Sequence, residues 1–238
     1  MKSCILLSGQ LRNAKNSFES IKKNLIDTYD ADVFISTWSN SNKIQKSNLA
    51  GGSVDDDSTI DEIINLYNPI TIEVDKYEDE LVEKFHRMIQ PFKSKAPIET
   101  KPLSVFMMWY KIMKVNQLKS RYEQTNGFKY DTVIRSRFDL NIDSQIEIID
   151  TQPNELYIPK GWDWKMGYND LFALGNSQSM DYYCDMFNNL LPMLDSGHIL
   201  HPEYLMKVYL DLSGFKINRP KMDVSLRGIK VYSKEAIY

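Results

Sequence analysis

The chain has 238 residues, of which 42% are hydrophobic and 26% charged, and its formal net charge is −3. This length and composition predict one globular α/β domain over residues 1–238, and the charge argues against a general nucleic-acid surface. The chain has only two cysteines, Cys4 and Cys184, so we expect no disulfide scaffold. We expect a reducing, cytoplasmic location instead. No apolar run approaches the roughly 18 residues of a membrane span.

The N-terminal segment predicts a strand, a glycine-containing turn and a helix. Residues 3–7 form a short apolar run, and apolar residues recur at helical spacing over residues 11–25. Backbone N–H groups at such a turn suit an anion, so we expect Ser8, Gly9 and Gln10 to bind a nucleotide, with Arg12 reaching a diphosphate. Alternatively, Gly9 only makes the turn and Arg12 faces solvent.

The next apolar run, over residues 32–38, predicts a second buried strand that ends in Trp38. The Trp38 ring could stack on a nucleotide base or pack beneath a loop. Further predictions are a polar loop over 40–58, a helix over 60–67 capped by Ser58 or Thr59, a more exposed strand over 70–74, a helix over 77–89, an irregular connection and candidate lid over 91–102, and a long helix over 103–122.

The segment YDTVIRSRFDL, residues 130–140, changes abruptly from apolar to charged. Its apolar half predicts a buried strand, and Arg135, Arg137 and Asp139 follow two residues apart, on one face of an extended chain. Charges at the carboxyl end of a strand lie where open α/β sheets bind ligands, and this set suits a phosphate or a divalent metal. A structural ion-pair network is the alternative.

The remaining sequence offers two further groups of candidate residues. Asn169 and Asp170 precede an apolar run ending at Gly175, and Asp170 could bind sugar hydroxyls or cap a turn. His201 and Glu203 flank Pro202 and could supply a metal ligand or a base, although Glu203 also suits the first turn of a helix. The elements predicted here are β-segments over 142–149 and 155–159, a helix over 177–191 capped by Ser177 or Ser179, a helix over 203–210, and short β-pieces within 214–238.

The order helix, YDxVIRxRFDL and G-x-N-D-x-F-x-x-G resembles GT-A glycosyltransferases of bacteria and viruses, in particular the WavE-like lipopolysaccharide and capsule-synthesis proteins. This resemblance implies a Rossmann-like GT-A domain with a mixed, mainly parallel sheet flanked by helices. It also implies a divalent cation, Mn²⁺ or Mg²⁺, held at a strand-end D-x-D motif. Here Arg137 takes the place of the first aspartate, which leaves Asp139, with His201 as a second candidate ligand.

We therefore expect a sugar transfer from a nucleotide-sugar donor to a hydroxyl group on a glycan or lipid-linked acceptor. Residues 1–125 would bind the nucleotide, and residues 126–238 would bind the metal, the donor sugar and the acceptor. Asp170 and Glu203 are the expected catalytic residues, and peripheral membrane contact would follow from a lipid-linked acceptor. The alternatives are another phosphate-handling transferase, such as a nucleotidyl- or phosphotransferase, and an inactive nucleotide- or carbohydrate-binding module.

Overall fold

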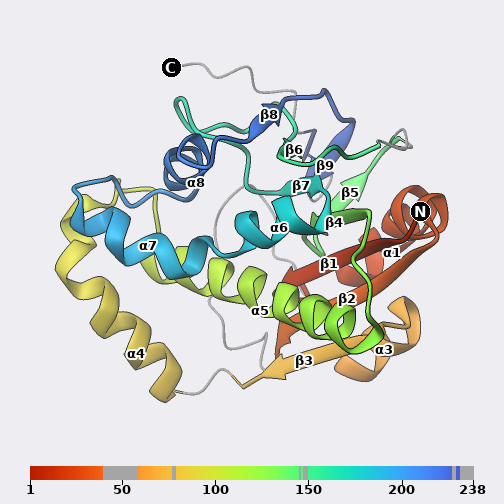
Figure 1. Ribbon diagram of the computed structural model, residues 1–238. Helices are drawn as coiled ribbons and strands as arrows, with labels where there is room; N and C mark the ends of the chain where they lie inside the picture. The colour runs from red at the N-terminus through yellow and green to blue at the C-terminus, as the bar shows by residue number, and fades with distance from the viewer. Residues whose placement is uncertain (40–57, 77–78, 145, 147–149, 227–228, 231–238) are drawn as a thin grey trace.

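A seven-stranded mixed sheet forms the centre of the molecule (Figure 1). The computed structural model describes residues 1–39, 58–76, 79–144, 146, 150–226 and 229–230. The strands of this sheet are β1 (Ser3–Gly9), β2 (Ala31–Trp38), β3 (Thr71–Asp75), β4 (Thr132–Ser136), β6 (Glu155–Tyr157), β7 (Phe172–Gly175) and β8 (Lys216–Asn218).

Their order is β3-β2-β1-β4-β7-β6-β8. Strands β1 to β4 are mutually parallel, β7 is antiparallel to both β4 and β6, and β8 is parallel to β6. The predicted α/β class with a mixed, mainly parallel sheet is therefore confirmed for the described residues. A smaller antiparallel sheet is formed by β5 (Leu140–Ile142), β9 (Val224–Leu226) and β10 (Ile229–Lys230).

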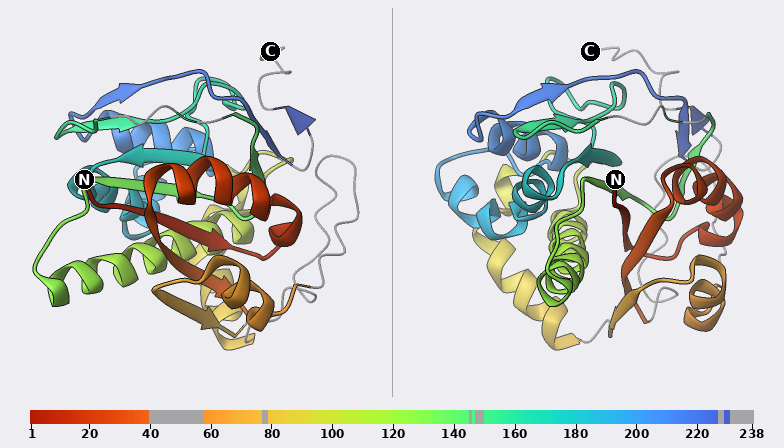
Figure 2. Two further views of the ribbon diagram at one scale, coloured as in Figure 1. Left: turned by 90° about the vertical axis from the view of Figure 1, so that its right-hand side faces the viewer. Right: turned by 45° about the vertical axis from the view of Figure 1, so that its right-hand side comes forward.

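Helices cover both faces of the large sheet, and β1 is accordingly apolar on both faces. Cys4 and Leu6 pack in one core cluster with residues of α5 (Pro102–Asn126), whereas Ile5 and Leu7 pack in a second cluster. That second cluster includes residues of α1 (Ala14–Ile21) and α3 (Ile60–Tyr67). Figure 2 shows α5 on one side of the sheet and α1 and α3 on the other.

Most predicted helices are confirmed, and Thr59 caps α3 in a capping box with Glu62. The helix predicted over residues 11–25 starts later, at Ala14, and continues as a π-helical turn over Lys22–Ile26. The other helices are α2 (Asp27–Tyr29), α4 (Asp79–Ile89), α6 (Ser177–Cys184), α7 (Met186–Asp195) and α8 (Pro202–Asp211).

Two local predictions are wrong. The helix predicted over 177–191 is divided into α6 and α7 at Asp185, and its N-cap is Asn176, whose side chain accepts from Ser179 N–H at 2.8 Å. The connection predicted over 91–102 begins with a 3-10 helix, η3 (Gln90–Lys95), because the ring of Phe92 packs into the core. Of the predicted polar loop, residues 40–57 lie outside the described residues, as do 145, 147–149, 227–228 and 231–238 of the later β-segments.

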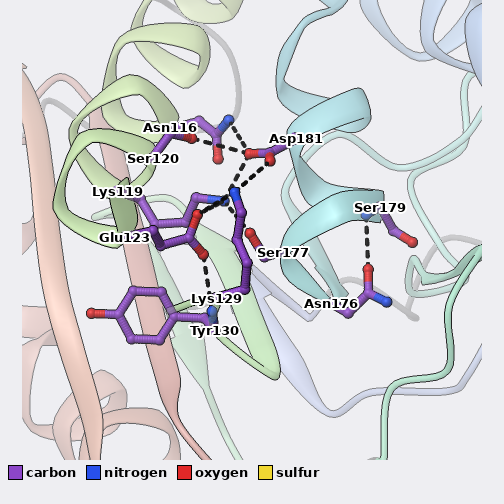
Figure 3. Close-up of polar contacts among 10 residues, drawn as sticks. All are labelled: Asn116, Lys119, Ser120, Glu123, Lys129, Tyr130, Asn176, Ser177, Ser179 and Asp181. Carbon is purple, nitrogen blue, oxygen red and sulfur yellow. Dashed lines mark hydrogen bonds and ion pairs between the residues drawn. The ribbon is translucent and has the colours of Figure 1, made fainter. Parts of the chain in front are cut away.

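A buried polar network connects α5 to α6 near the amino end of β4 (Figure 3). The Lys119 ammonium lies 2.7 Å from Ser177 Oγ and from Asp181 Oδ1, and 3.4 Å from Glu123 Oε2. Lys129 adds a second cation, 2.8 Å from the same Glu123 oxygen. The side chains of Lys119 and Glu123 are fully buried, and each charge has a partner of opposite sign. The network therefore holds α5 and α6 together without leaving an unpaired buried charge.

Within the described ranges, no helix combines the length and the apolar character needed to cross a bilayer.

Candidate functional site

The carboxyl ends of β1, β2 and β4 meet at one edge of the sheet because these strands are parallel and adjacent. Gly9 pairs with Thr37, whose hydroxyl donates to the Gly9 carbonyl at 2.8 Å, and Leu7 pairs with Ser136. The amino end of β7 reaches the same edge, since Phe172 pairs with Ser136. Residues that follow β1 and β4 and residues that precede β7 are thereby brought together.

The turn after β1 has the geometry of a strand-to-helix connection. Gly9 has φ +110°, a backbone conformation that residues with a side chain rarely adopt. Asn13, at φ 55°, is the N-cap residue of α1, but its side chain makes no capping hydrogen bond. Ser8 is buried, and its hydroxyl has no hydrogen-bond partner among the described residues. Gln10 and Arg12 are half-buried beside it. Binding of a nucleotide by this turn stays a prediction.

At the end of β4, Arg137 and Asp139 form a two-point ion pair. The strand ends at Ser136, and a turn over residues 138–139 brings the Asp139 carboxylate back to Arg137. Arg137 donates from Nε at 2.7 Å and from Nη2 at 2.9 Å, one bond to each carboxylate oxygen. Although burial alone would lower the pKa of Arg137, the Asp139 carboxylate raises it above its ordinary value. The Arg137 side chain remains 24% exposed, against 4% for Asp139.

Arg135, in contrast, lies in the interior, where it is 1% exposed. One guanidinium nitrogen donates to the backbone carbonyl of Asp170, which follows from the pairing of Arg135 with Ala173 across β4 and β7. The three charged residues of this segment therefore do not act alike. Arg135 supports the chain at Asp170, and Arg137 is the guanidinium that reaches the surface.

The segment that carries Asp170 is held by buried backbone contacts. The Asn169 side chain donates to the Gly161 carbonyl at 2.6 Å and accepts from Leu171 N–H at 2.7 Å, so Asn169 is structural. Gly167 packs directly on α8: a Cβ at this position would lie 2.7 Å from the carbonyl carbon of Glu203. The next residue, Tyr168, donates its N–H to the Glu203 carbonyl at 3.1 Å. These contacts place Asp170 beside the start of α8.

Glu203 lies in the first turn of α8, as the sequence indicated. Burial, and then the negative charge of Asp170, raise the pKa of Glu203 above its usual range, partly offset by His201. The Nδ1 atom of His201 lies 2.7 Å from Glu203 Oε2 without hydrogen-bond geometry, and neither atom has a hydrogen-bond partner in the described part of the chain. The His201 ring stacks on Trp164, with ring centroids 3.9 Å apart.

Together these residues form a compact group of opposite charges. Asp170 and Glu203 both raise the pKa of Arg137, so all three side chains act on one another electrostatically. Asp170 is buried, and no hydrogen bond or ion pair of its carboxylate is found among the described residues. The Arg137 guanidinium interacts with the carboxyl groups of Asp139, Asp170 and Glu203, and the environment of Glu203 favours its protonated form. Such a group can bind polar ligands and exchange one proton.

The donor set does not fit a divalent cation as the resemblance implied. Both carboxylate oxygens of Asp139 accept from Arg137, so a metal ion would have to compete with this guanidinium for them. His201 is directed at Glu203 rather than at Asp139. Over the described ranges, no group of three or more His, Cys, Asp or Glu side chains is placed to hold a metal ion.

Trp38 belongs to the core in this structure. It is 2% exposed, its ring stacks on Tyr110 at 6.0 Å, and the Lys111 ammonium lies 4.4 Å from its ring centre. Lys111 is fully buried and pairs with Asp75 at 2.8 Å; burial lowers its pKa, although Asp75 opposes this effect. This arrangement favours the packing alternative for Trp38 over stacking on a base.

Three residues that were not among the predicted site residues also shape the site. Trp164 and Gly167 position His201 and Glu203, and Asp163 accepts from Asn169 N–H at 2.8 Å and from Arg219 at 2.6 Å. The available signal was the cluster of glycine, tryptophan and aspartate over residues 161–170, a composition typical of a tightly turned loop.

A scan against protein-family models finds no match for this chain, and no curated protein matches its sequence.

Proposed function

We propose that this protein transfers a sugar from a nucleotide-sugar donor to a hydroxyl group on a glycan or lipid-linked acceptor. The supporting observation is the convergence of Arg137, Asp170 and Glu203 beside the carboxyl ends of parallel strands. Open α/β sheets bind ligands at this edge. The parallel order β3-β2-β1-β4 with an antiparallel β7 is compatible with the GT-A-like fold that the sequence resemblance implies.

In this proposal, Arg137 stabilises the diphosphate that leaves the donor. A guanidinium has five N–H donors, and Asp139 accepts from two of the nitrogens of Arg137, so further donors remain on a partly exposed side chain. Asp170 accepts hydrogen bonds from hydroxyl groups of the sugar. The backbone at Asp170 is held in place by the contacts of Asn169 and by the bond from Arg135 to the Asp170 carbonyl.

Glu203 acts as the general base. As the bond between the anomeric carbon and the diphosphate breaks, the acceptor oxygen forms the new bond to that carbon and its proton passes to Glu203. A base works best when its pKa approaches the working pH, and the raised pKa of Glu203 moves it in that direction. Asp170 contributes to this shift through its negative charge.

Donor binding and turnover test these roles separately. Thermal shifts with UDP-, GDP-, CMP- and dTDP-sugars identify the nucleotide, since a ligand that binds the folded state raises the Tm. With that donor, Glu203→Gln should keep the thermal shift and reduce turnover about 10²–10⁴-fold. Arg137→Gln should reduce the shift itself. Glu19→Gln, an exposed carboxyl on α1, is the matched control and should change neither.

The products separate this proposal from its alternatives. Free nucleoside diphosphate with a glycosylated acceptor supports sugar transfer. Release of pyrophosphate or inorganic phosphate instead would favour a nucleotidyl- or phosphotransferase. Binding without turnover on any acceptor would favour an inactive module, and full activity of Glu203→Gln would refute the role of the base.

A further inference from the structure

Two exposed apolar side chains occupy the tips of neighbouring tight turns. Thr100 N–H donates to the Pro97 carbonyl at 3.0 Å, which closes a turn with Ile98 at its tip. Gly167 N–H donates to the Trp164 carbonyl at 2.8 Å and closes a second turn with Met166 at its tip. Ile98 is 105% exposed and Met166 is 81% exposed. Turn tips usually carry polar residues, and exposed apolar side chains that group on neighbouring turns are typical of an interaction site.

Contacts between the segments hold these turns side by side. Trp164 donates from its indole nitrogen to Glu99 Oε1 at 3.0 Å, which joins the two turns directly. A third segment, between α7 and α8, joins them: Leu200 N–H donates to the Lys95 carbonyl at 3.1 Å, and His201 stacks on Trp164. This segment adds Ile199, which is also exposed. We call Ile98, Met166 and Ile199 with their turns the apolar rim.

The charged residues around the apolar rim are mostly basic. Lys93, Lys101 and Lys165 are exposed in or next to the segments that form it, against two exposed acids, Glu99 and Asp195. This local excess of positive charge differs from the whole chain, whose net charge is −3. Apolar tips surrounded by lysines match an anionic bilayer surface, in which side chains enter the interface while ammonium groups contact the headgroups.

We propose that the apolar rim docks the protein on anionic lipid surfaces. Ile98 and Met166 insert at the level of the headgroups, and Lys93, Lys101 and Lys165 pair with lipid phosphates. Trp164 belongs to the same turn as Met166 and stacks on His201, so the docked face adjoins the group formed by Asp170 and Glu203. The docking proposal stands on exposure and charge and does not depend on the reaction proposed above.

Co-sedimentation with vesicles tests this proposal. Wild-type protein should bind mixed phosphatidylcholine–phosphatidylglycerol vesicles more tightly than phosphatidylcholine alone, and added salt should weaken the binding. Ile98→Ser and Met166→Ser should each weaken it about tenfold, and Lys165→Gln about fivefold. Because the replaced side chains are exposed, the variants should retain the wild-type Tm, which is measured in parallel.

Matched controls lie elsewhere on the surface. Leu212 is 77% exposed beyond the far end of α8, and Lys23 is exposed in the π-helical turn after α1. Leu212→Ser and Lys23→Gln should bind as the wild type does. Absence of binding, equal binding to both kinds of vesicle, or unchanged binding of the Ile98→Ser/Met166→Ser double variant would overturn the proposal and leave a protein partner as the occupant of this surface.

Discussion

Replacing Lys119 by methionine would test the buried network of Figure 3. Removal of one partner from a buried ion pair costs about 3–5 kcal/mol, because the remaining charge is left uncompensated. Here the loss of stability should be smaller, because both carboxylates retain other partners. Glu123 still pairs with Lys129 at 2.8 Å and accepts from Tyr130 N–H at 2.9 Å, and Asp181 still accepts from Asn116 at 2.9 Å. We therefore expect a loss near the lower limit, about 3 kcal/mol.

Urea and thermal unfolding measure this loss. For a chain of this size, about 1 kcal/mol corresponds to roughly 2–4 °C in Tm, so Lys119→Met should unfold about 6–12 °C below the wild type. Lys129→Met is the matched control because it removes a cation from the same network. Its side chain is 59% exposed, so solvent screens its charge, and the expected loss is about 1 kcal/mol or less. Equal losses in the two variants would refute the distinction between buried and exposed charges.

Three further predictions concern the candidate site. Gly167→Ala should lower the free energy of unfolding by about 1–3 kcal/mol, since its Cβ would meet backbone atoms of Glu203; an unchanged urea midpoint would contradict this packing. The raised pKa of Glu203 contributes stability below pH 4.5, and this contribution is lost as the pH rises through the folded-state pKa. Relative to the wild type, Glu203→Gln should thus become more stable across this window in thermal unfolding, and a constant difference would refute the shift. Because the Asp139 carboxylate is paired with Arg137, EDTA should leave the donor-induced thermal shift unchanged. A thermal shift that EDTA abolishes and Mn²⁺ restores would contradict this expectation.

The large sheet could be predicted because its strands are short apolar runs separated by turns. Residues 3–7 of β1 are buried on both faces, and this requires a parallel strand between two layers of helices. The division of α6 from α7 could not be predicted in the same way, because apolar residues continue at helical spacing past Asp185. Local side-chain bonds to Asp185, from Asn188 at 2.6 Å among others, accompany the break.

At the site, residue type indicated the chemistry but not its geometry. Arg135 and Arg137 are equivalent in the sequence pattern, yet the pairing of β4 with β7 buries the first and leaves the second at the edge. The proximity of Asp170 to Glu203 depends on Gly167, whose contact with α8 is a long-range packing event. No spacing rule within residues 161–175 could have supplied that contact.

The close approach of Gly167 to the backbone of Glu203 has a consequence for how the site can move. With the Tyr168 hydrogen bond to the same residue, it couples the turn below Asp170 to the first turn of α8. A substrate that displaces one of these carboxyl groups must therefore shift the other in the same direction. Asp170 and Glu203 should therefore move together when a ligand binds. The distance between them should be the same in the free and the bound protein.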